Sequence, residues 1–191
     1  SNEINPIALN SYQHTALEEI NSLFETQNIV LLHGVTSSGK TEIYIKKIEA
    51  ILAEGKQALY LVPEIALTSQ LVQRLQKYFG NQIAVYHSRY SQNERVEVWN
   101  HVLNQSESAR VVIGARSSVF LPFSNLGLVI IDEEHEQSYK QFDPAPRYHA
   151  RDTALVLATL FKAQSLLGSA TPSLESFNNA TKIDKYGYVA L

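Results

Sequence analysis

A glycine-rich stretch that ends in lysine and threonine has the residue types and spacing of a phosphate-binding loop. It reads Gly34-Val35-Thr36-Ser37-Ser38-Gly39-Lys40-Thr41. The glycines let successive backbone N–H groups converge on an anion, and the positive end of the following helix dipole points to the same place. In such loops the lysine reaches the β- and γ-phosphates, and the threonine hydroxyl ligates Mg²⁺. The sequence therefore predicts ATP binding at residues 34–41, with Lys40 and Thr41 in these roles.

A second group of reactive side chains is the run Asp132-Glu133-Glu134-His135, which directly follows four apolar residues at 128–131. In a nucleotide site, the first carboxylate holds Mg²⁺ and the next orients and deprotonates the water that attacks the γ-phosphate. Asp132 and Glu133 fit these roles. A solvated acidic turn is the alternative for these residues taken alone. Together with the phosphate loop, they predict a hydrolysis site in which Glu133 and Lys40 are catalytic.

The elements that must position these residues follow from the hydrophobic pattern. Apolar runs of strand length alternate with segments of helical periodicity, which predicts an α/β fold, mostly a parallel sheet with helices on both faces. Ligands bind at the carboxyl ends of such strands. The phosphate loop and residues 132–135 should therefore lie at one edge of the sheet. The expected strands are 29–33, 58–62, 83–86, 110–114, 128–132 and 165–168. The expected helices are 12–27, 40–53, 64–78, 92–104 and 148–162.

Three local features can be predicted within these elements. Asn10 or Ser11 should cap the first helix, and Pro63 should open the third. Trp99 lies at helical spacing from Val102, so we expect it in the hydrophobic core.

Composition limits the possible classes of protein. The 191 residues suit one domain, and 45% hydrophobic with 18% charged residues is ordinary for a soluble globular chain. A net charge of −3 argues against nucleic-acid binding by bulk electrostatics alone. The chain has no cysteine, which excludes disulfides and thiolate metal sites, and no membrane-length apolar run or secretory signal, so we expect a cytoplasmic protein. The absence of methionine suggests an excised fragment in which Ser1-Asn2 is a cloning remnant.

Five blocks along the chain closely resemble the bacterial primosomal replication-restart helicases, a family of superfamily 2 whose motor has two RecA-like lobes. The Asp-Glu-Glu-His variant with its Ser-Tyr-Lys-Gln extension is the most specific block. The resemblance implies that residues 1–191 are the first lobe, a RecA-like P-loop NTPase fold. Residues 1–11 would be an N-terminal extension and 173–191 the start of a connection to a second lobe. The blocks are Gly-Val-Thr-Ser-Ser-Gly-Lys-Thr-Glu-Ile-Tyr (34–44), Val-Pro-Glu-Ile-Ala-Leu-Thr (62–68), Gly-Ala-Arg-Ser-Ser-Val-Phe (114–120), Asp-Glu-Glu-His-Glu-Gln-Ser-Tyr-Lys-Gln (132–141) and Gly-Ser-Ala-Thr-Pro-Ser (168–173).

The resemblance also implies roles for further residues. Gln13 would read both edges of adenine, and its alternative is a capping pair with Asn10. His135, Ser169 and Thr171 would couple the nucleotide state to movement of the lobes. A first DNA-binding set would hold the phosphate backbone of single-stranded DNA and has packing and capping as its alternative. That set is Pro63, Thr68, Arg116 and Ser117.

A second DNA-binding set lies in the proline-containing stretch 137–151, where aromatic rings would stack bases and cations would hold phosphates. By resemblance this is a loop that senses DNA and couples it to ATP hydrolysis. A hydrophobic plug under a bent loop is the alternative. The set comprises Tyr139, Phe142 and Tyr148 as aromatic residues and Lys140, Arg147 and Arg151 as cations.

As a whole, the resemblance implies a 3′-to-5′ DNA helicase that uses ATP and Mg²⁺ to reload the replication machinery at stalled forks. Its partners would be single-stranded or forked DNA, the primosome and single-strand-binding proteins, with no membrane partner. Zinc would be bound elsewhere in the parent protein, because His87, His101 and His149 lack metal-ligand spacing. We expect the fragment to be a monomer that binds nucleotide weakly and does not unwind DNA. A P-loop small-molecule kinase and a non-catalytic nucleotide-switch scaffold are the alternatives.

Overall fold

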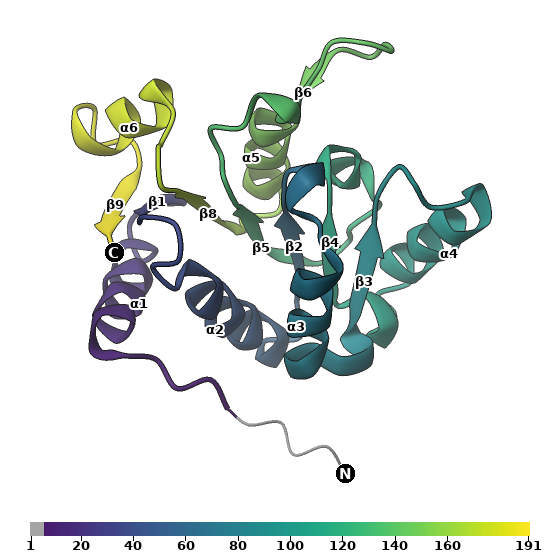
Figure 1. Ribbon diagram of the computed structural model, residues 1–191, viewed down its shortest axis with the longest axis horizontal. Helices are drawn as coiled ribbons and strands as arrows, with labels where there is room; N and C mark the ends of the chain where they lie inside the picture. Colours follow the sequence, from purple (N-terminus) through teal and green to yellow (C-terminus); the bar gives the residue numbers. More distant parts are fainter. Residues whose placement is uncertain (1–5) are drawn as a thin grey trace.

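Strands and helices alternate along the chain in this computed structural model, which describes residues 6–191 (Figure 1). The expected cloning remnant Ser1-Asn2 lies outside the described residues. The main-sheet strands are β1 (Ile29–His33), β2 (Gln57–Leu61), β3 (Ile83–Tyr86), β4 (Val111–Gly114), β5 (Leu126–Ile131), β8 (Gln164–Ser169) and β9 (Gly187–Ala190). The α-helices are α1 (Ser11–Leu23), α2 (Lys40–Ala53), α3 (Ser69–Phe79), α4 (Gln92–Leu103), α5 (Ala150–Leu160) and α6 (Leu174–Thr181).

The seven strands form one parallel sheet in the order β3-β4-β2-β5-β8-β1-β9. Strand β8 lies between β1 and β5, with His33 opposite Ser169 and Ile131 opposite Leu167. The segments that follow β1, β5 and β8 therefore leave the sheet at the same edge. The predicted α/β fold with a parallel sheet is confirmed, and so is the placement of the two reactive segments at one edge.

Each face of the sheet carries its own hydrophobic core. One core joins the strands to α1, α2 and α3, and the other joins them to α4, α5 and α6. Neighbouring strand residues alternate between the two, since Leu32 packs in the first and Leu31 in the second. Both are fully buried, as expected for strands covered on both faces. Figure 1 shows α2 and α3 on the opposite side of the sheet from α5 and α6.

The predicted cap of α1 is confirmed and the predicted start of the third helix is wrong. Asn10 caps α1 in a capping box with Gln13. Helix α3 begins at Ser69, where the Thr68 hydroxyl accepts a hydrogen bond from the Leu71 N–H. Pro63 instead precedes the short 3₁₀ helix η1 (Glu64–Ala66). A hydroxyl cap five residues downstream therefore sets the beginning of the α-helix.

The core position predicted for Trp99 is also wrong. Its side chain is 42% exposed, whereas Val102 on the same helix is fully buried. Helix α4 lies beside β3, the edge strand of the sheet, and so only a narrow stripe of the helix faces the core.

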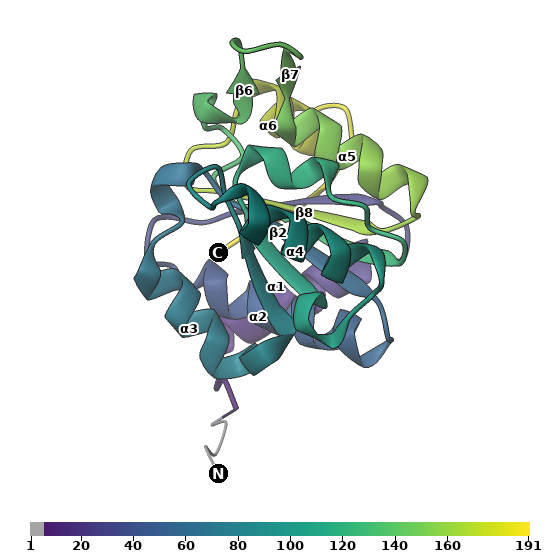
Figure 2. The ribbon, with the colours of Figure 1, turned by 90° about the vertical axis from the view of Figure 1, so that its right-hand side faces the viewer.

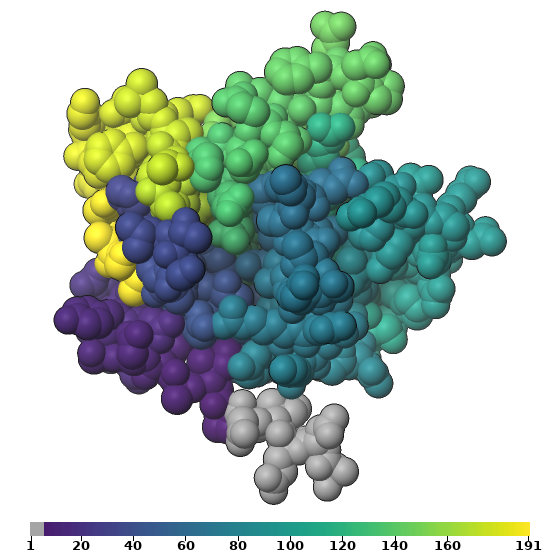
Figure 3. All heavy atoms as spheres, viewed as in Figure 1, coloured from purple at the N-terminus to yellow at the C-terminus, as the bar shows by residue number. Residues whose placement is uncertain are grey.

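The C-terminal residues expected to start a connection to a second lobe contribute a strand to the sheet, and the connection itself stays a prediction. They form α6 and β9, and β9 pairs with β1 at the opposite edge of the sheet from β3. Figure 3 shows this segment beside α1 on the molecular surface. Within residues 6–191, no helix combines the length and apolar character needed to cross a bilayer.

A candidate nucleotide-hydrolysis site

The phosphate loop joins β1 to α2 and relies on a glycine at the helix start. Gly39 has φ 91°, in the left-handed region that favours glycine, and no side chain caps α2. A Cβ atom at this position would come within 2.1 Å of Gln13 Nε2. The first-turn N–H groups of α2 thus face the loop without a side chain in front of them, which is the arrangement that binds an anion.

The side chain of Lys40 folds back onto the phosphate loop and binds its backbone. Its Nζ donates to the carbonyl oxygens of Gly34 (2.7 Å) and Val35 (3.1 Å). Burial lowers the pKa of Lys40, and the nearby carboxylates of Asp132 and Glu133 oppose that shift. The predicted cation and the predicted carboxylates are therefore brought together.

Asp132 and Glu133 lie just beyond the end of β5. The Tyr44 hydroxyl (2.9 Å) and the Glu133 N–H (3.1 Å) both donate to Asp132 Oδ1. Both bonds hold the carboxyl group through Oδ1 and leave Oδ2 available to a ligand in the cavity. Burial raises the pKa of Asp132, while the bond from Tyr44 lowers it. Glu133 has φ 47°, a strained value for a residue with a side chain, and such strain is common at functional sites.

A cavity of about 600 Å³ opens between these residues at the carboxyl edge of the sheet. The residues that line it include most of the phosphate loop, both carboxylates and the predicted coupling residues His135 and Thr171. The lining is Thr36, Ser37, Gly39, Lys40, Thr41, Glu42, Arg74, Asp132, Glu133, His135, Glu136, Ala170 and Thr171.

The donor set in this cavity fits magnesium held jointly with a nucleotide. The Thr41 hydroxyl and the Asp132 carboxylate line the same space from α2 and from the end of β5. In the part of the chain that the structure describes, no cluster of three or more His, Cys, Asp or Glu side chains could hold a metal alone. Magnesium in nucleotide sites commonly takes one or two protein oxygens and completes its shell with phosphates and water.

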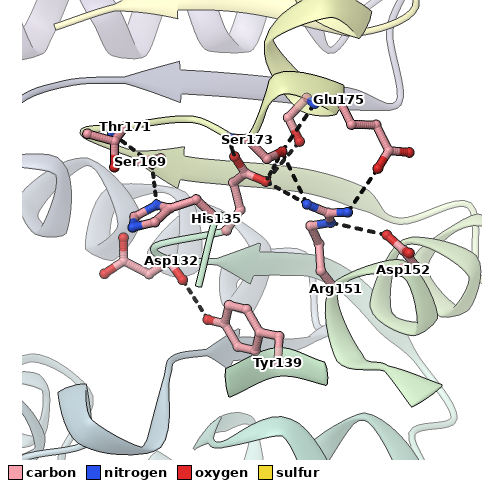
Figure 4. A network of polar contacts seen from close by, with 11 residues as sticks. Asp132, His135, Tyr139, Arg151, Asp152, Ser169, Thr171, Ser173 and Glu175 are labelled. Atoms are coloured by element: carbon pink, nitrogen blue, oxygen red, sulfur yellow. Dashed lines mark hydrogen bonds and ion pairs between the residues drawn. The ribbon is translucent and has the colours of Figure 1, made fainter. Parts of the chain in front are cut away.

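The three predicted coupling residues form a hydrogen-bonded chain (Figure 4). The Thr171 N–H donates to Ser169 Oγ (3.0 Å), and Ser169 Oγ lies 2.6 Å from His135 Nδ1. Ser169 Oγ thus accepts from Thr171 and shares a hydrogen bond with His135 Nδ1, and the tautomer of the imidazole sets the direction of that second bond. The segment after β8 is thereby tied to the end of β5. The coupling role itself stays a prediction.

Arg151, predicted to bind DNA phosphates, instead pairs with a buried carboxylate near these hydrogen bonds. Arg151 is only 7% exposed, and its Nη1 donates to the fully buried Glu134 (3.1 Å). Glu134 also accepts bonds from the Ser173 N–H (2.6 Å) and the Ser176 hydroxyl (2.8 Å). Figure 4 shows Arg151 surrounded by Ser173, Asp152 and Glu175. Three carboxylates therefore hold the guanidinium inside the protein, and it is not free to bind DNA phosphates.

Tyr139 likewise lies inside the protein. It is 1% exposed, and its hydroxyl donates to the carbonyl oxygen of Asp132 (2.5 Å) and lies 3.2 Å from that of Leu61. Burial raises the pKa of Tyr139 well above its usual value. Tyr139 therefore holds the backbone of the acidic segment through its hydroxyl group, and its ring is not exposed for base stacking. The sequence-based expectation for this residue is corrected accordingly.

The other residues of the aromatic stretch are accessible. The segment forms a hairpin of β6 (Lys140–Gln141) and β7 (Tyr148–His149), which Figure 2 shows projecting from the body of the protein. Phe142 is 69% exposed at the hairpin, and Lys140 and Arg147 are exposed as well. Tyr148 is half-buried, with its ring edge-on to Phe120 at 4.8 Å.

One of the predicted backbone-binding residues, Arg116, contacts the start of this hairpin. Arg116 Nη1 donates to the carbonyl oxygens of Ser138 and Lys140, each at 3.2 Å. Arg116 also shares a small cleft of about 70 Å³ with the buried Pro63. Thr68 is exposed and Ser117 half-buried. Binding of DNA by these four residues stays a prediction.

Gln13 forms the capping pair that sequence reasoning left as its alternative. Its side-chain oxygen accepts from the Asn10 N–H (2.9 Å), while its backbone N–H donates to the Asn10 side chain (2.8 Å). Its amide nitrogen donates to the Gly39 carbonyl (3.2 Å), so α1 is tied to the phosphate loop. Recognition of adenine by Gln13 stays a prediction.

Sequence reasoning missed several residues of the site, among them Tyr44, Gly168, Glu42 and Arg74. Tyr44 holds Asp132, and Gly168 makes room for it, because a Cβ at Gly168 would lie 1.6 Å from the Tyr44 hydroxyl. Glu42 and Arg74 line the cavity and form an ion pair between α2 and α3. Tyr44 could have been found, since it follows Lys40 by one helical turn. Sequence spacing gives no signal for a pair formed between two helices.

Known proteins share both the sequence and the fold of this chain. The DEAD/DEAH box helicase family model matches residues 10–180. The replication restart protein PriA of Bacillus subtilis is 49% identical over 179 residues, 93% of this chain and 22% of that protein. PriA of Haemophilus influenzae is 50% identical over 191 residues, 100% of this chain and 25% of that protein.

Solved structures agree with this match. RecG bound to a three-way DNA junction has a TM-score of 0.67 at 25% identity, covering 97% of this chain and 24% of that chain. The helicase MrfA, at 21% identity, shares the fold with a TM-score of 0.62 over 96% of this chain and 30% of that chain. The chain spans about a quarter of the length of the curated relatives it matches. It is a RecA-like lobe, is homologous to one region of PriA, and belongs to the DEAD/DEAH box helicase family.

Proposed function

We propose that this chain is the ATP-binding lobe of a 3′-to-5′ DNA helicase that reloads the replication machinery at stalled forks. The cavity at the carboxyl edge of the sheet carries the proposal, because Lys40, Thr41, Asp132 and Glu133 all line it. The match to the helicase family model and the 50% sequence identity to PriA of Haemophilus influenzae support the same function. They favour it over the small-molecule kinase and the nucleotide-switch scaffold.

The residues of the cavity divide the work of hydrolysis. The N–H groups at the start of α2 and the Lys40 ammonium hold the phosphates, while Thr41 and Asp132 hold Mg²⁺. Magnesium supplies charge neutralisation at the phosphates when it is bound. Glu133 orients the attacking water and accepts its proton. His135 faces the same cavity and, through Ser169, connects it to the segment after β8.

The DNA side of the proposal rests on the hairpin of β6 and β7. Phe142 offers an exposed ring for stacking, and Lys140 and Arg147 offer local positive charge. Local contacts of this kind suit a chain with a net charge of −3. Single-stranded or forked DNA would be the ligand, with the primosome and single-strand-binding proteins as further partners in the cytoplasm.

Nucleotide binding by the isolated chain is the first test. We expect weak binding of ATP and ADP with Mg²⁺ in a fluorescent-nucleotide titration, and loss of binding in Lys40→Ala. Hydrolysis should stay near background, because we assign the arginine contacts that hydrolysis needs at the γ-phosphate to a second lobe. Robust DNA-stimulated hydrolysis by the isolated chain would contradict that division into two lobes.

Glu133→Gln in the full-length helicase tests the role of the carboxylate. A motor should lose hydrolysis and keep nucleotide binding, because glutamine occupies the same space but cannot accept the proton. A nucleotide-switch scaffold should be unaffected by the change. Measuring binding and hydrolysis on the same sample separates these two outcomes.

A further inference from the structure

A second basic side chain, in addition to Lys40, lines the cavity. Arg74 lies on α3, and its side chain is 44% exposed at the cavity. Its guanidinium pairs with the carboxylate of Glu42 in the first turn of α2. Glu42 is 25% exposed and lines the same cavity. The ion pair therefore lies at the rim of the nucleotide site, where a bound anion can compete for the arginine.

The cavity has more acidic than basic side chains, so a second cation would help to balance the charge of a bound nucleotide. The carboxylates of the cavity come from Glu42, Asp132, Glu133 and Glu136, and a magnesium–triphosphate complex adds further negative charge. Lys40 is partly occupied by the loop carbonyls. A guanidinium presents a rigid fork of donors that fits the oxygens of a phosphate as well as those of a carboxylate. Arg74 can therefore exchange one anion for the other by a side-chain movement.

The topology indicates which end of the nucleotide Arg74 faces. Helix α3 follows β2, which lies beyond β5, whereas α1 and Gln13 lie near β9 at the far side of the phosphate loop. The proposed magnesium ligands Thr41 and Asp132 lie between these two sides. Arg74 is thus on the side of the hydrolytic carboxylates, where the terminal phosphate would lie, and away from Gln13.

We propose that Arg74 leaves Glu42 and binds the terminal phosphate when ATP enters the cavity, so that this lobe distinguishes ATP from ADP by itself. The inference rests on the proposed function, because it takes ATP as the ligand. Glu42 holds the guanidinium at the rim until the nucleotide arrives. A static ion pair between α2 and α3 is the competing explanation, and exposed pairs of that kind contribute little to stability.

The affinities of the chain for ATP and ADP, each with Mg²⁺, test the inference by calorimetry or fluorescence titration. Arg74→Gln should weaken ATP binding about tenfold, as expected for loss of a charge-assisted hydrogen bond, and should change ADP binding less than about twofold. Glu42→Gln should leave ATP binding as strong or strengthen it, because the guanidinium is released. Arg74→Lys should fall between wild type and Arg74→Gln. Lys77→Gln, an exposed cation on the same helix, is the matched control and should change neither affinity.

Each contrary result has a separate meaning. Equal loss of ATP and ADP binding in Arg74→Gln, or no loss of either, would overturn the role of Arg74. Equal weakening by Arg74→Gln and Glu42→Gln would show a static pair. If the wild-type chain bound neither nucleotide, the proposed function would fail as well. Far-UV circular dichroism and thermal unfolding of every variant identify changes that come from misfolding, and Arg74→Lys and Glu42→Gln retain the test if Arg74→Gln does not fold.

Discussion

Arg151→Met should destabilise the fold because it leaves a charge buried. Glu134 is fully buried and would lose its only cationic partner among residues 6–191, while keeping the hydrogen bonds from Ser173 and Ser176. Breaking a buried ion pair by removing one partner costs roughly 3–5 kcal/mol. Since neutral donors remain, we place the loss of unfolding free energy near the lower end, at about 3 kcal/mol.

The expected loss can be measured by urea unfolding followed by circular dichroism. For a chain of this length, about 3 kcal/mol corresponds to a fall of roughly 6–12 °C in the unfolding temperature. Glu134→Gln combined with Arg151→Met removes both charges and should recover part of the loss, because no buried charge is left unpaired. Lys162→Met, at an exposed position after α5, is the control. A loss below about 1 kcal/mol in Arg151→Met would refute this account of the buried pair.

Three further outcomes follow from the site. Gly168→Ala should destabilise the protein by about 1–3 kcal/mol and weaken ATP binding with Mg²⁺, because the new Cβ meets the Tyr44 hydroxyl. Adding Tyr44→Phe should restore part of the stability, because it removes the nearest atom. Gly39→Ala should abolish nucleotide binding in a titration, whereas Gly55→Ala, which has a similar φ of 78° but open space around it, should cost only about 1 kcal/mol in urea unfolding. Burial lowers the pKa of Lys47 to about 8 in the folded protein, from a usual value of 10.5. Between these two pH values the unfolded chain therefore binds more protons at Lys47 than the folded chain does. The contribution of Lys47 to stability should therefore increase from about pH 8 upward, and Lys47→Met should lack this increase in thermal unfolding at pH 7.5 and 9.5.

The sequence predicts those parts of the site that depend on local spacing. The phosphate loop is contiguous, and the carboxylates at 132–133 directly follow a strand, so the parallel sheet alone brings them to one edge. The buried positions of Tyr139 and Arg151 could not be predicted in this way. An aromatic residue and a cation in a polar stretch read as exposed, and only the carbonyl of Asp132 and the carboxylate of Glu134 explain their burial. Those partners precede Tyr139 and Arg151 by 7 and 17 residues, and only the fold after β5 turns the chain back onto them.

Strand β9 illustrates the same limit at the level of the fold. Residues 187–190 are too short to give a periodic pattern, and they form a strand because β1 offers a free edge. Trp99 shows the reverse case, in which helical spacing is correct but the helix lies at the edge of the sheet and leaves the side chain half in solvent. Periodicity gives the type of an element, and the position of that element in the sheet decides how much of it is buried.

Consecutive residues after β5 connect separate parts of the lobe. Asp132 is bonded to Tyr44 on α2, Glu134 to Arg151 at the start of α5, and His135 to Ser169 at the end of β8. Glu133, between them, has a strained backbone and faces the cavity. Arg151 follows the hairpin of β6 and β7 by two residues. Any displacement of the hairpin that moves α5 must therefore be accommodated at Glu134, one peptide bond from the proposed catalytic carboxylate, because the buried pair cannot separate without a large cost.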